Sequence, residues 1–112
     1  MSHRSTGAKP WLLWGLLAAS SPGIAVESVP APERQAQLQH LLTQDCGSCH
    51  GLRLAGGLGP PLLPEALANK PIEYLVAVIL HGQTGTAMPP WRPLLSPADA
   101  TWLARTLKGE VP

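Results

Sequence analysis

Hydrophobic residues recur at helical spacing in three separate segments of this chain. In residues 33–44, Leu38, Leu41 and Leu42 stand at i, i+3 and i+4, while polar residues such as glutamine and arginine occupy other positions. This spacing places the leucines on one face of an α-helix and the polar side chains on the other. The whole segment is therefore predicted to be an amphipathic helix.

The second segment, residues 71–81, carries a helical stripe of aliphatic side chains. Pro71 is expected at the first helical position, with Asn69 or Lys70 as the N-cap, because proline fits the first turn of a helix. Gly82 is the expected end of this helix. The stripe consists of Ile72, Leu75, Val76, Ile79 and Leu80.

The third segment begins with the strongest start signal in the chain. Ser96-Pro97-Ala98-Asp99 combines a serine N-cap, a proline in the first turn and an acidic residue three positions after the cap, which together predict a capping box. Gly109 ends the predicted helix. Its apolar face consists of Trp102, Leu103, Thr106 and Leu107.

The connections between these helices are rich in glycine and proline. Residues 51–64 include Gly56-Gly57-Leu58-Gly59-Pro60-Pro61, which predicts a loop with fixed turns. Residues 64–68 are expected to form a short helical turn. Residues 26–32 contain two prolines and no periodicity, so they are expected to be a flexible leader. Short helices joined by such loops predict an all-α domain over residues 33–112.

The first 25 residues have the layout of a secretory signal peptide. Arg4 and Lys9 precede the uncharged apolar run at 11–19, and Gly23-Ile24-Ala25 offers a cleavage sequence, with Ala18-x-Ser20 as a second choice. The run falls short of the ~20 residues that a spanning helix needs, although an uncleaved membrane anchor is the alternative. Cleavage implies an exported protein, which in a bacterium means a periplasmic one with no membrane span.

Removal of residues 1–25 would leave 87 of the 112 residues and change the formal net charge from +1 to about −1, because Arg4 and Lys9 are lost. Nothing in this charge balance suggests nucleic acid or an anionic membrane surface as a partner. A chain of this length with no phenylalanine and one tyrosine has little to bury by itself. A cofactor is therefore expected to complete the core.

The chemistry of the chain is concentrated in Cys46-Gly47-Ser48-Cys49-His50, a Cys-x-x-Cys-His motif typical of covalent attachment of a c-type haem. Two thiols separated by two residues lie about one turn apart, so they can add to the two neighbouring vinyl groups at one edge of a porphyrin. His50 can then place its imidazole on the iron. The motif predicts Cys46 and Cys49 as the anchors of one haem c and His50 as its proximal ligand.

Three other structures are open to a Cys-x-x-Cys pair. A disulfide between Cys46 and Cys49 would close a very short, strained loop. A thioredoxin-like redox pair belongs in a βαβ unit, and no strand pattern flanks this motif. A structural zinc site needs four ligands, usually from a second Cys or His pair, and the sequence offers none at similar spacing. The haem motif is the most specific of these interpretations.

From about Glu33 to Leu107 the sequence resembles the monohaem class I cytochromes c, in which an N-terminal helix runs straight into the haem motif. The stretches at 45–52, 57–62 and 88–91 are similar to the cytochrome c55X type, which is encoded with cytochrome cd1 nitrite reductases. The resemblance implies the small class I cytochrome c fold, with three main helices wrapped around one covalent haem.

The resemblance also implies two contacts. In this family the terminal helix crosses the first helix, which would bring Trp102 against Leu38 or Leu42. A Gly-Pro pair about ten residues after the haem histidine supplies a backbone carbonyl to its Nδ1, and the matching pair here is Gly59-Pro60. Such a hydrogen bond would fix the imidazole and raise its basicity.

Met88 is the expected sixth ligand of the iron. Apart from Met1 it is the only methionine, and it lies in a Gly- and Pro-flanked loop where the family places its axial methionine. A thioether is neutral and soft, so it favours Fe(II) and raises the reduction potential. His81 and His40 are the alternative ligands, and packing in the core is the alternative role of Met88.

Trp91 and Arg92 follow Met88 closely and are candidate partners of the haem propionates, through the indole N–H or the guanidinium. Packing over the haem edge is the alternative role of Trp91, and Arg92 could equally be solvated. Arg53 has the same potential role with less support.

The resemblance implies one-electron transfer in the periplasm, with no catalytic residue. Filling both axial positions of the iron leaves no site for a substrate. The implied partners are redox proteins, either cytochrome cd1 nitrite reductase or an enzyme in the maturation of its haem d1, and the protein is expected to be a monomer. Two alternatives are an open-iron enzyme or sensor with Met88 detached, and a carrier or chaperone for haem d1.

Overall fold

The computed structural model of the protein describes residues 1–3, 7, 15, 18–23 and 28–111. Over these residues it contains helices and irregular connections and no strand. Most of the apolar run at 11–19 lies outside the described residues, as do Ile24 and Ala25 of the predicted cleavage sequence. None of the helices in the described ranges is long and apolar enough to cross a membrane.

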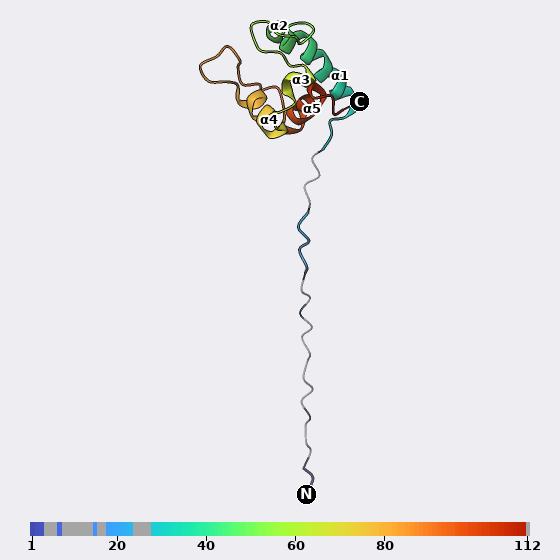
Figure 1. Cartoon of the computed structure of the whole chain (residues 1–112). Helices are drawn as coiled ribbons and strands as arrows, with labels where there is room; N and C mark the ends of the chain where they lie inside the picture. The colour runs from blue at the N-terminus through green and yellow to red at the C-terminus, as the bar shows by residue number, and fades with distance from the viewer. Residues whose placement is uncertain (4–6, 8–14, 16–17, 24–27, 112) are drawn as a thin grey trace.

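The first helical arm carries both cysteines (Figure 1). α1 (Pro32–Leu41) continues into the π-helical turn η1 (Leu42–Cys46) and then into α2 (Gly47–His50). The predicted helix end at Gln44 is wrong, because the first glycine with a positive φ, Gly51 at 90°, comes only after the haem motif. The motif is therefore part of a continuous helical arm rather than of a turn that follows a helix.

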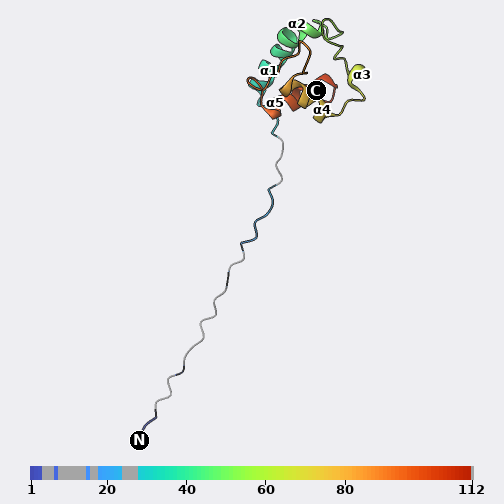
Figure 2. The same cartoon turned by 90° about the vertical axis from the view of Figure 1, so that its left-hand side faces the viewer.

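α3 (Pro64–Leu67), α4 (Ile72–His81) and α5 (Pro97–Leu107) complete the fold. α4 and α5 pack against each other. In the view of Figure 2, α1 and α2 lie on one side of this pair and α3 lies on the other. The short helical turn predicted at residues 64–68 is confirmed by α3.

The start of α5 has the predicted capping box. The side-chain hydroxyl of Ser96 accepts a hydrogen bond from the backbone N–H of Asp99 at 3.1 Å. The carboxylate of Asp99 in turn accepts from the backbone N–H of Ser96 at 3.1 Å. Gly109 follows the end of the helix with a φ of 73°. Both predicted ends of α5 are therefore confirmed.

The start of α4 differs from the prediction. Pro71 is the N-cap rather than the first helical residue, because its ψ of 149° is extended. The predicted cap at Asn69 or Lys70 is therefore wrong. Gly82 follows the last helical residue with a φ of 69°, as predicted.

The core is centred on Leu38 of α1 and Leu103 of α5, whose side chains are 0% and 1% exposed. Trp102 belongs to the same hydrophobic cluster as Leu38 and Leu42. The cluster is completed by Leu67, Leu75, Leu80, Leu95, Ala100, Ala104 and Leu107.

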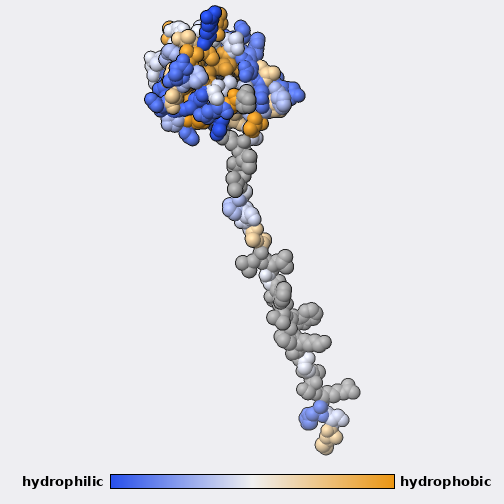
Figure 3. Space-filling view, turned by 45° about the vertical axis from the view of Figure 1, so that its right-hand side comes forward, coloured by the Kyte–Doolittle hydropathy of each residue, from blue (hydrophilic) through white to orange (hydrophobic). Residues whose placement is uncertain are grey.

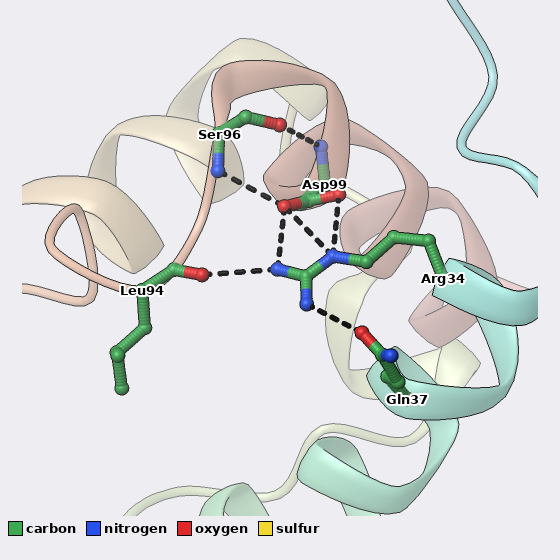
Figure 4. Close-up of polar contacts among 5 residues, drawn as sticks. All are labelled: Arg34, Gln37, Leu94, Ser96 and Asp99. Carbon is green, nitrogen blue, oxygen red and sulfur yellow. Dashed lines mark hydrogen bonds and ion pairs between the residues drawn. The ribbon is translucent and has the colours of Figure 1, made fainter.

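An ion pair also joins α1 to α5 (Figure 4). Arg34 Nη2 donates to Asp99 Oδ2 at 2.8 Å and to the carbonyl oxygen of Leu94 at 3.0 Å. The carboxyl of Asp99 is almost buried, and the hydrogen bond from Arg34 holds the pKa of Asp99 below its ordinary value. Local sequence patterns do not predict this contact, because the two residues lie 65 positions apart.

Candidate haem-binding site

A cavity of about 670 Å³ lies between the helical arm, α4, α5 and the loop that follows α4. Its size is in the range of about 300–1,000 Å³ that is usual for cofactor and ligand sites. Most of its lining is aliphatic and comes from distant parts of the chain, including Leu42, Leu67, Leu75, Leu95, Leu103 and Leu107. The cavity can therefore take a large, flat and mainly apolar group.

Cys46 and Cys49 both line this cavity. They stand three positions apart on the continuous helix of η1 and α2, so their side chains project from the same face. Both are free thiols, not joined in a disulfide. Burial, and to a smaller extent the carboxylate of Asp45, raises the pKa of Cys46 to about 11. The Cys46 thiol is therefore neutral at pH 7.

His50 ends α2 and is 9% exposed. Its Nδ1 lies 2.7 Å from the carbonyl oxygen of Pro60. A carbonyl only accepts, so Nδ1 is the donor, and in the neutral ring Nε2 is then the nitrogen with the lone pair that a metal requires. The hydrogen bond implied by the resemblance is present in the structure.

The loop after the motif is folded back against His50. The backbone N–H of Gly59 donates to the carbonyl of Cys49 at 2.8 Å, and that of Gly56 donates to the carbonyl of His50 at 2.8 Å. A Cβ on Gly59 would lie 2.7 Å from Nδ1 of His50, which is closer than real Cβ contacts allow. Glycine at this position lets the carbonyl of Pro60 reach the imidazole.

Met88 reaches the same cavity from the loop after α4 and is half-buried. Its carbonyl accepts from the backbone N–H of Gln83 at 3.2 Å, and the N–H of Trp91 donates to the carbonyl of Ile79 at 3.0 Å. A Cβ on Gly82 would lie 2.7 Å from the carbonyl oxygen of Met88. The loop is therefore closed onto the end of α4 at both of its ends.

The other predicted residues divide into two groups. Trp91 lines the cavity and is half-buried. The remaining predicted side chains are exposed and lie outside the cavity lining, namely Arg92, Arg53, His81 and His40. The structure brings Cys46, Cys49, His50 and Met88 together and leaves these four side chains outside.

Several polar residues of the cavity were not predicted from the sequence. Lys70, Tyr74 and Gln83 contribute to its lining along α4. The spacing of Lys70 and Tyr74, four positions apart at the start of an aliphatic helix, could have indicated that the two side chains lie close together. It does not show that both face a cavity.

The zinc alternative is wrong for the part of the chain that the structure describes, where no three His, Cys, Asp or Glu side chains are grouped to hold a metal ion. The groups that converge suit a haem instead: two free thiols on one helix face, a histidine whose Nδ1 donates to a carbonyl, a thioether and aliphatic walls. These residues fit a covalent haem with one histidine and one methionine ligand.

Comparisons with known proteins agree with this geometry. A family model described as cytochrome c oxidase, cbb3-type, subunit III matches residues 33–105. The chain is 59% identical to the cytochrome c55X of Pseudomonas aeruginosa over 111 residues, which are 97% of this chain and 92% of that protein. The chain belongs to the cytochrome c55X family. The predicted family and the predicted all-α class I cytochrome c fold are therefore confirmed.

Two solved structures are similar to this chain in fold as well as in sequence. A structure titled c-type cytochrome NirC superposes with a TM-score of 0.71 at 64% identity and covers 71% of this chain and 94% of its own. A structure titled dihydro-heme d1 dehydrogenase NirN in complex with DHE superposes with a TM-score of 0.58 at 38% identity, over 62% of this chain and 15% of that one. The c55X fold thus also resembles one small part of a larger protein.

Proposed function

We propose that this c55X protein is an exported cytochrome that carries single electrons in the periplasm on one covalent haem c. The observation that supports this most directly is the convergence of Cys46, Cys49, His50 and Met88 on one apolar cavity. Residues 1–25 would be a cleaved signal peptide, 26–32 a leader and 33–112 the cytochrome domain. An exported chain agrees with thioether attachment, which in bacteria takes place outside the cytoplasm.

Each residue has a defined role in this proposal. Cys46 and Cys49 would form the thioethers, and His50 Nε2 and the Met88 sulfur would be the axial ligands of the iron. When bound, the haem supplies a reversible Fe(III)/Fe(II) couple. The carbonyl of Pro60 orients the His50 ring, and the backbone contacts of the Met88 loop would position the thioether for the iron. Two protein ligands leave no open position for a substrate, so the protein would act as a carrier and not as an enzyme.

The surface beside the haem motif suits brief contacts with other proteins. Leu52 and Leu58, in the loop after the motif, are 77% and 79% exposed, and Ser48 within the motif is exposed too. Figure 3 shows that hydrophobic side chains reach the surface of the folded part among hydrophilic ones. Small and weak interfaces are typical of electron-transfer partners, which must separate quickly. We expect the haem edge at this surface to be the point of electron transfer.

The proposed partners are cytochrome cd1 nitrite reductase or an enzyme in the maturation of its haem d1, as part of denitrification. A second observation links the chain to maturation: it is 43% identical over 54 residues, which are 48% of this chain and 11% of that protein, to the dihydro-heme d1 dehydrogenase of Pseudomonas aeruginosa. A dehydrogenase must pass on two electrons for each substrate that it oxidises. Two molecules of this cytochrome would accept one electron each, and the two protons that leave the substrate would pass to the solvent.

The proposal is tested by optical spectra of the oxidised and reduced holoprotein, wild type beside Met88→Ala, produced with a haem maturation system. We expect a low-spin haem with a sulfur-to-Fe(III) charge-transfer band in the wild type, and loss of that band in Met88→Ala. A wild type without the band that binds carbon monoxide or nitrite would instead favour an open-iron sensor or enzyme.

A further inference from the structure

One part of the cavity lining is polar and has no role in anchoring or ligating the haem. Lys70 precedes α4, Tyr74 lies in its first turn, and Gln83 follows its end. The Nζ of Lys70 lies 5.3 Å from the centre of the Tyr74 ring, and Gln83 Nε2 lies 3.3 Å from the Tyr74 hydroxyl, to which it donates. These three residues, the Tyr74 cluster, are joined to one another through Tyr74.

The charges of the cavity are unevenly placed. Among the residues that the structure describes, Lys70 is the one lysine or arginine in the lining, and Asp45 is the one carboxylate. Asp45 directly precedes the first anchoring cysteine. The carboxylate of Asp45 beside the thiols is therefore unfavourable for a haem carboxylate, and the ammonium of Lys70 is favourable.

A haem has the opposite polarity along its plane. Its two vinyl groups, which the cysteines use, lie toward one edge, and its two carboxylates lie toward the other. Anchoring at Cys46 and Cys49 would therefore direct the carboxylates away from Asp45, toward another part of the lining. Carboxylates in such a site need hydrogen-bond donors and a cation to offset their desolvation.

We propose that the Tyr74 cluster is the subsite that holds the haem carboxylates, with Lys70 as their cation. This inference rests on the proposed function, because it requires a haem anchored at Cys46 and Cys49. The Tyr74 hydroxyl accepts from Gln83, so its own proton is free to donate to a carboxylate, and the amide of Gln83 has a second N–H.

The backbone that carries Lys70 is held from α5. Lys108 Nζ donates to the carbonyl of Lys70 at 2.6 Å and to the carbonyl of Leu67 at 3.3 Å. The backbone N–H of Lys70 also donates to the carbonyl of Leu67 at 3.0 Å. The turn between α3 and α4 is thus fixed, and the ammonium lies over the Tyr74 ring, where a cation–π contact stabilises it.

Arg92 has no comparable position. The side chains of Arg92 and Lys70 are both exposed, but only that of Lys70 belongs to the cavity lining. The backbone N–H of Arg92 donates to the carbonyl of Leu80 at 3.2 Å. In this inference Lys70 takes the role that the sequence analysis gave to Arg92. Arg92 is therefore the matched control, since it also carries one positive charge and lies near Met88 in sequence.

The test compares ferric and ferrous holoprotein of the wild type, Lys70→Gln, Lys70→Arg, Tyr74→Phe and Arg92→Gln. Two readouts are used: the midpoint potential, and the redox-induced infrared difference spectrum of haem labelled with ¹³C in its carboxylates. Loss of a nearby positive charge favours Fe(III), so we expect Lys70→Gln to lower the potential and to change the reduction equilibrium by a factor of roughly 3 to 10.

The carboxylate bands should shift in both Lys70→Gln and Tyr74→Phe. Lys70→Arg should restore the potential, and Arg92→Gln should leave both readouts at their wild-type values. The subsite is overturned if Arg92→Gln moves the bands while Lys70→Gln does not, or if neither variant moves them. A wild type that lacks covalent haem would overturn both the subsite and the proposed function, whereas unmoved bands in a low-spin holoprotein would overturn the subsite alone.

Discussion

The two sides of the haem cavity are built in different ways. On the side of His50, both thiols and the imidazole belong to five consecutive residues at the end of one helical arm, and the ring is fixed by a carbonyl only ten positions away. On the side of Met88, the thioether depends on a loop whose backbone must fit against Gly82 and the end of α4. Local sequence thus positions His50, whereas the fit between two backbone segments positions Met88.

Gly82→Ala is expected to have the largest effect, because it would break the side of Met88. Gly82 has a φ of 69°, and a Cβ would lie 2.7 Å from the carbonyl oxygen of Met88 and 2.8 Å from the carbonyl carbon of Pro89. The backbone strain and the clash together should lower the free energy of unfolding by about 2–5 kcal/mol. Denaturant titration of the holoprotein measures this loss, and the sulfur-to-Fe(III) band should disappear.

Gly85→Ala is the control for that variant. Gly85 has a similar φ of 79°, but no atom lies within 4 Å of its added Cβ. It should therefore cost only the strain of the left-handed region, about 1–2 kcal/mol, and keep the sulfur band. Equal losses of unfolding free energy in the two variants would show that the close approach of the Met88 loop is not the reason for glycine at position 82.

Gly59→Ala perturbs the side of His50. Its Cβ would lie 2.7 Å from His50 Nδ1, so the ring or the loop must move and the hydrogen bond to Pro60 must lengthen. Overpacking of this kind costs about 1–3 kcal/mol. Loss of this bond lowers the basicity of the imidazole and so stabilises Fe(III) less, which should raise the midpoint potential. Nuclear magnetic resonance of the Nδ1 proton reports the bond directly, and an unchanged signal would contradict the prediction.

Asp99→Asn should lower the free energy of unfolding without disturbing either the His50 side or the Met88 side of the cavity. The variant loses the ion pair with Arg34 and weakens the capping box of α5, which should cost about 1–2 kcal/mol at pH 7. Unfolding curves measure this cost, and the haem spectrum should stay that of the wild type. A change in axial ligation would show that the α1–α5 contact reaches the iron site.

The pH dependence of the Asp99 contribution has a defined sign. The pKa of Asp99 is lowered in the folded protein, so its stabilising effect is fully present above the ordinary carboxyl value of about 3.9. It is lost as the pH falls through the lower, folded value. The stability difference between wild type and Asp99→Asn should therefore be constant near neutrality and shrink in acid below about pH 4.

Thr86→Val is expected to have the smallest effect and sharpens the description of the Met88 loop. The Thr86 hydroxyl donates to the carbonyl of Gln83 at 2.8 Å and accepts from the backbone N–H of Met88 at 3.3 Å. Both groups are exposed, so their loss should cost only about 0.5–1 kcal/mol. Ligand exchange at the iron, followed with added imidazole, should become faster in this variant and remain unchanged in Gly59→Ala.

Most of the fold was predictable because its signals are local. The box of Ser96 and Asp99, the glycine after α4 and the leucine stripe of α1 each act within a few positions of the chain. The predictions failed where a boundary depends on neighbouring structure: the first helix continues past Gln44 through a π-helical turn, and Pro71 caps α4 rather than starting it.

The sequence by itself determined the haem motif, the family and the candidate ligands, because thioether attachment requires two thiols and a histidine at one fixed spacing. Only the tertiary structure decided which other side chains face the cavity. It placed Lys70 and Tyr74 in the lining and left Arg92 outside. It also joined Arg34 to Asp99 across 65 positions. The physical reason is that a periodic pattern defines the face of a helix, whereas the partner of that face is set by the packing of the whole chain.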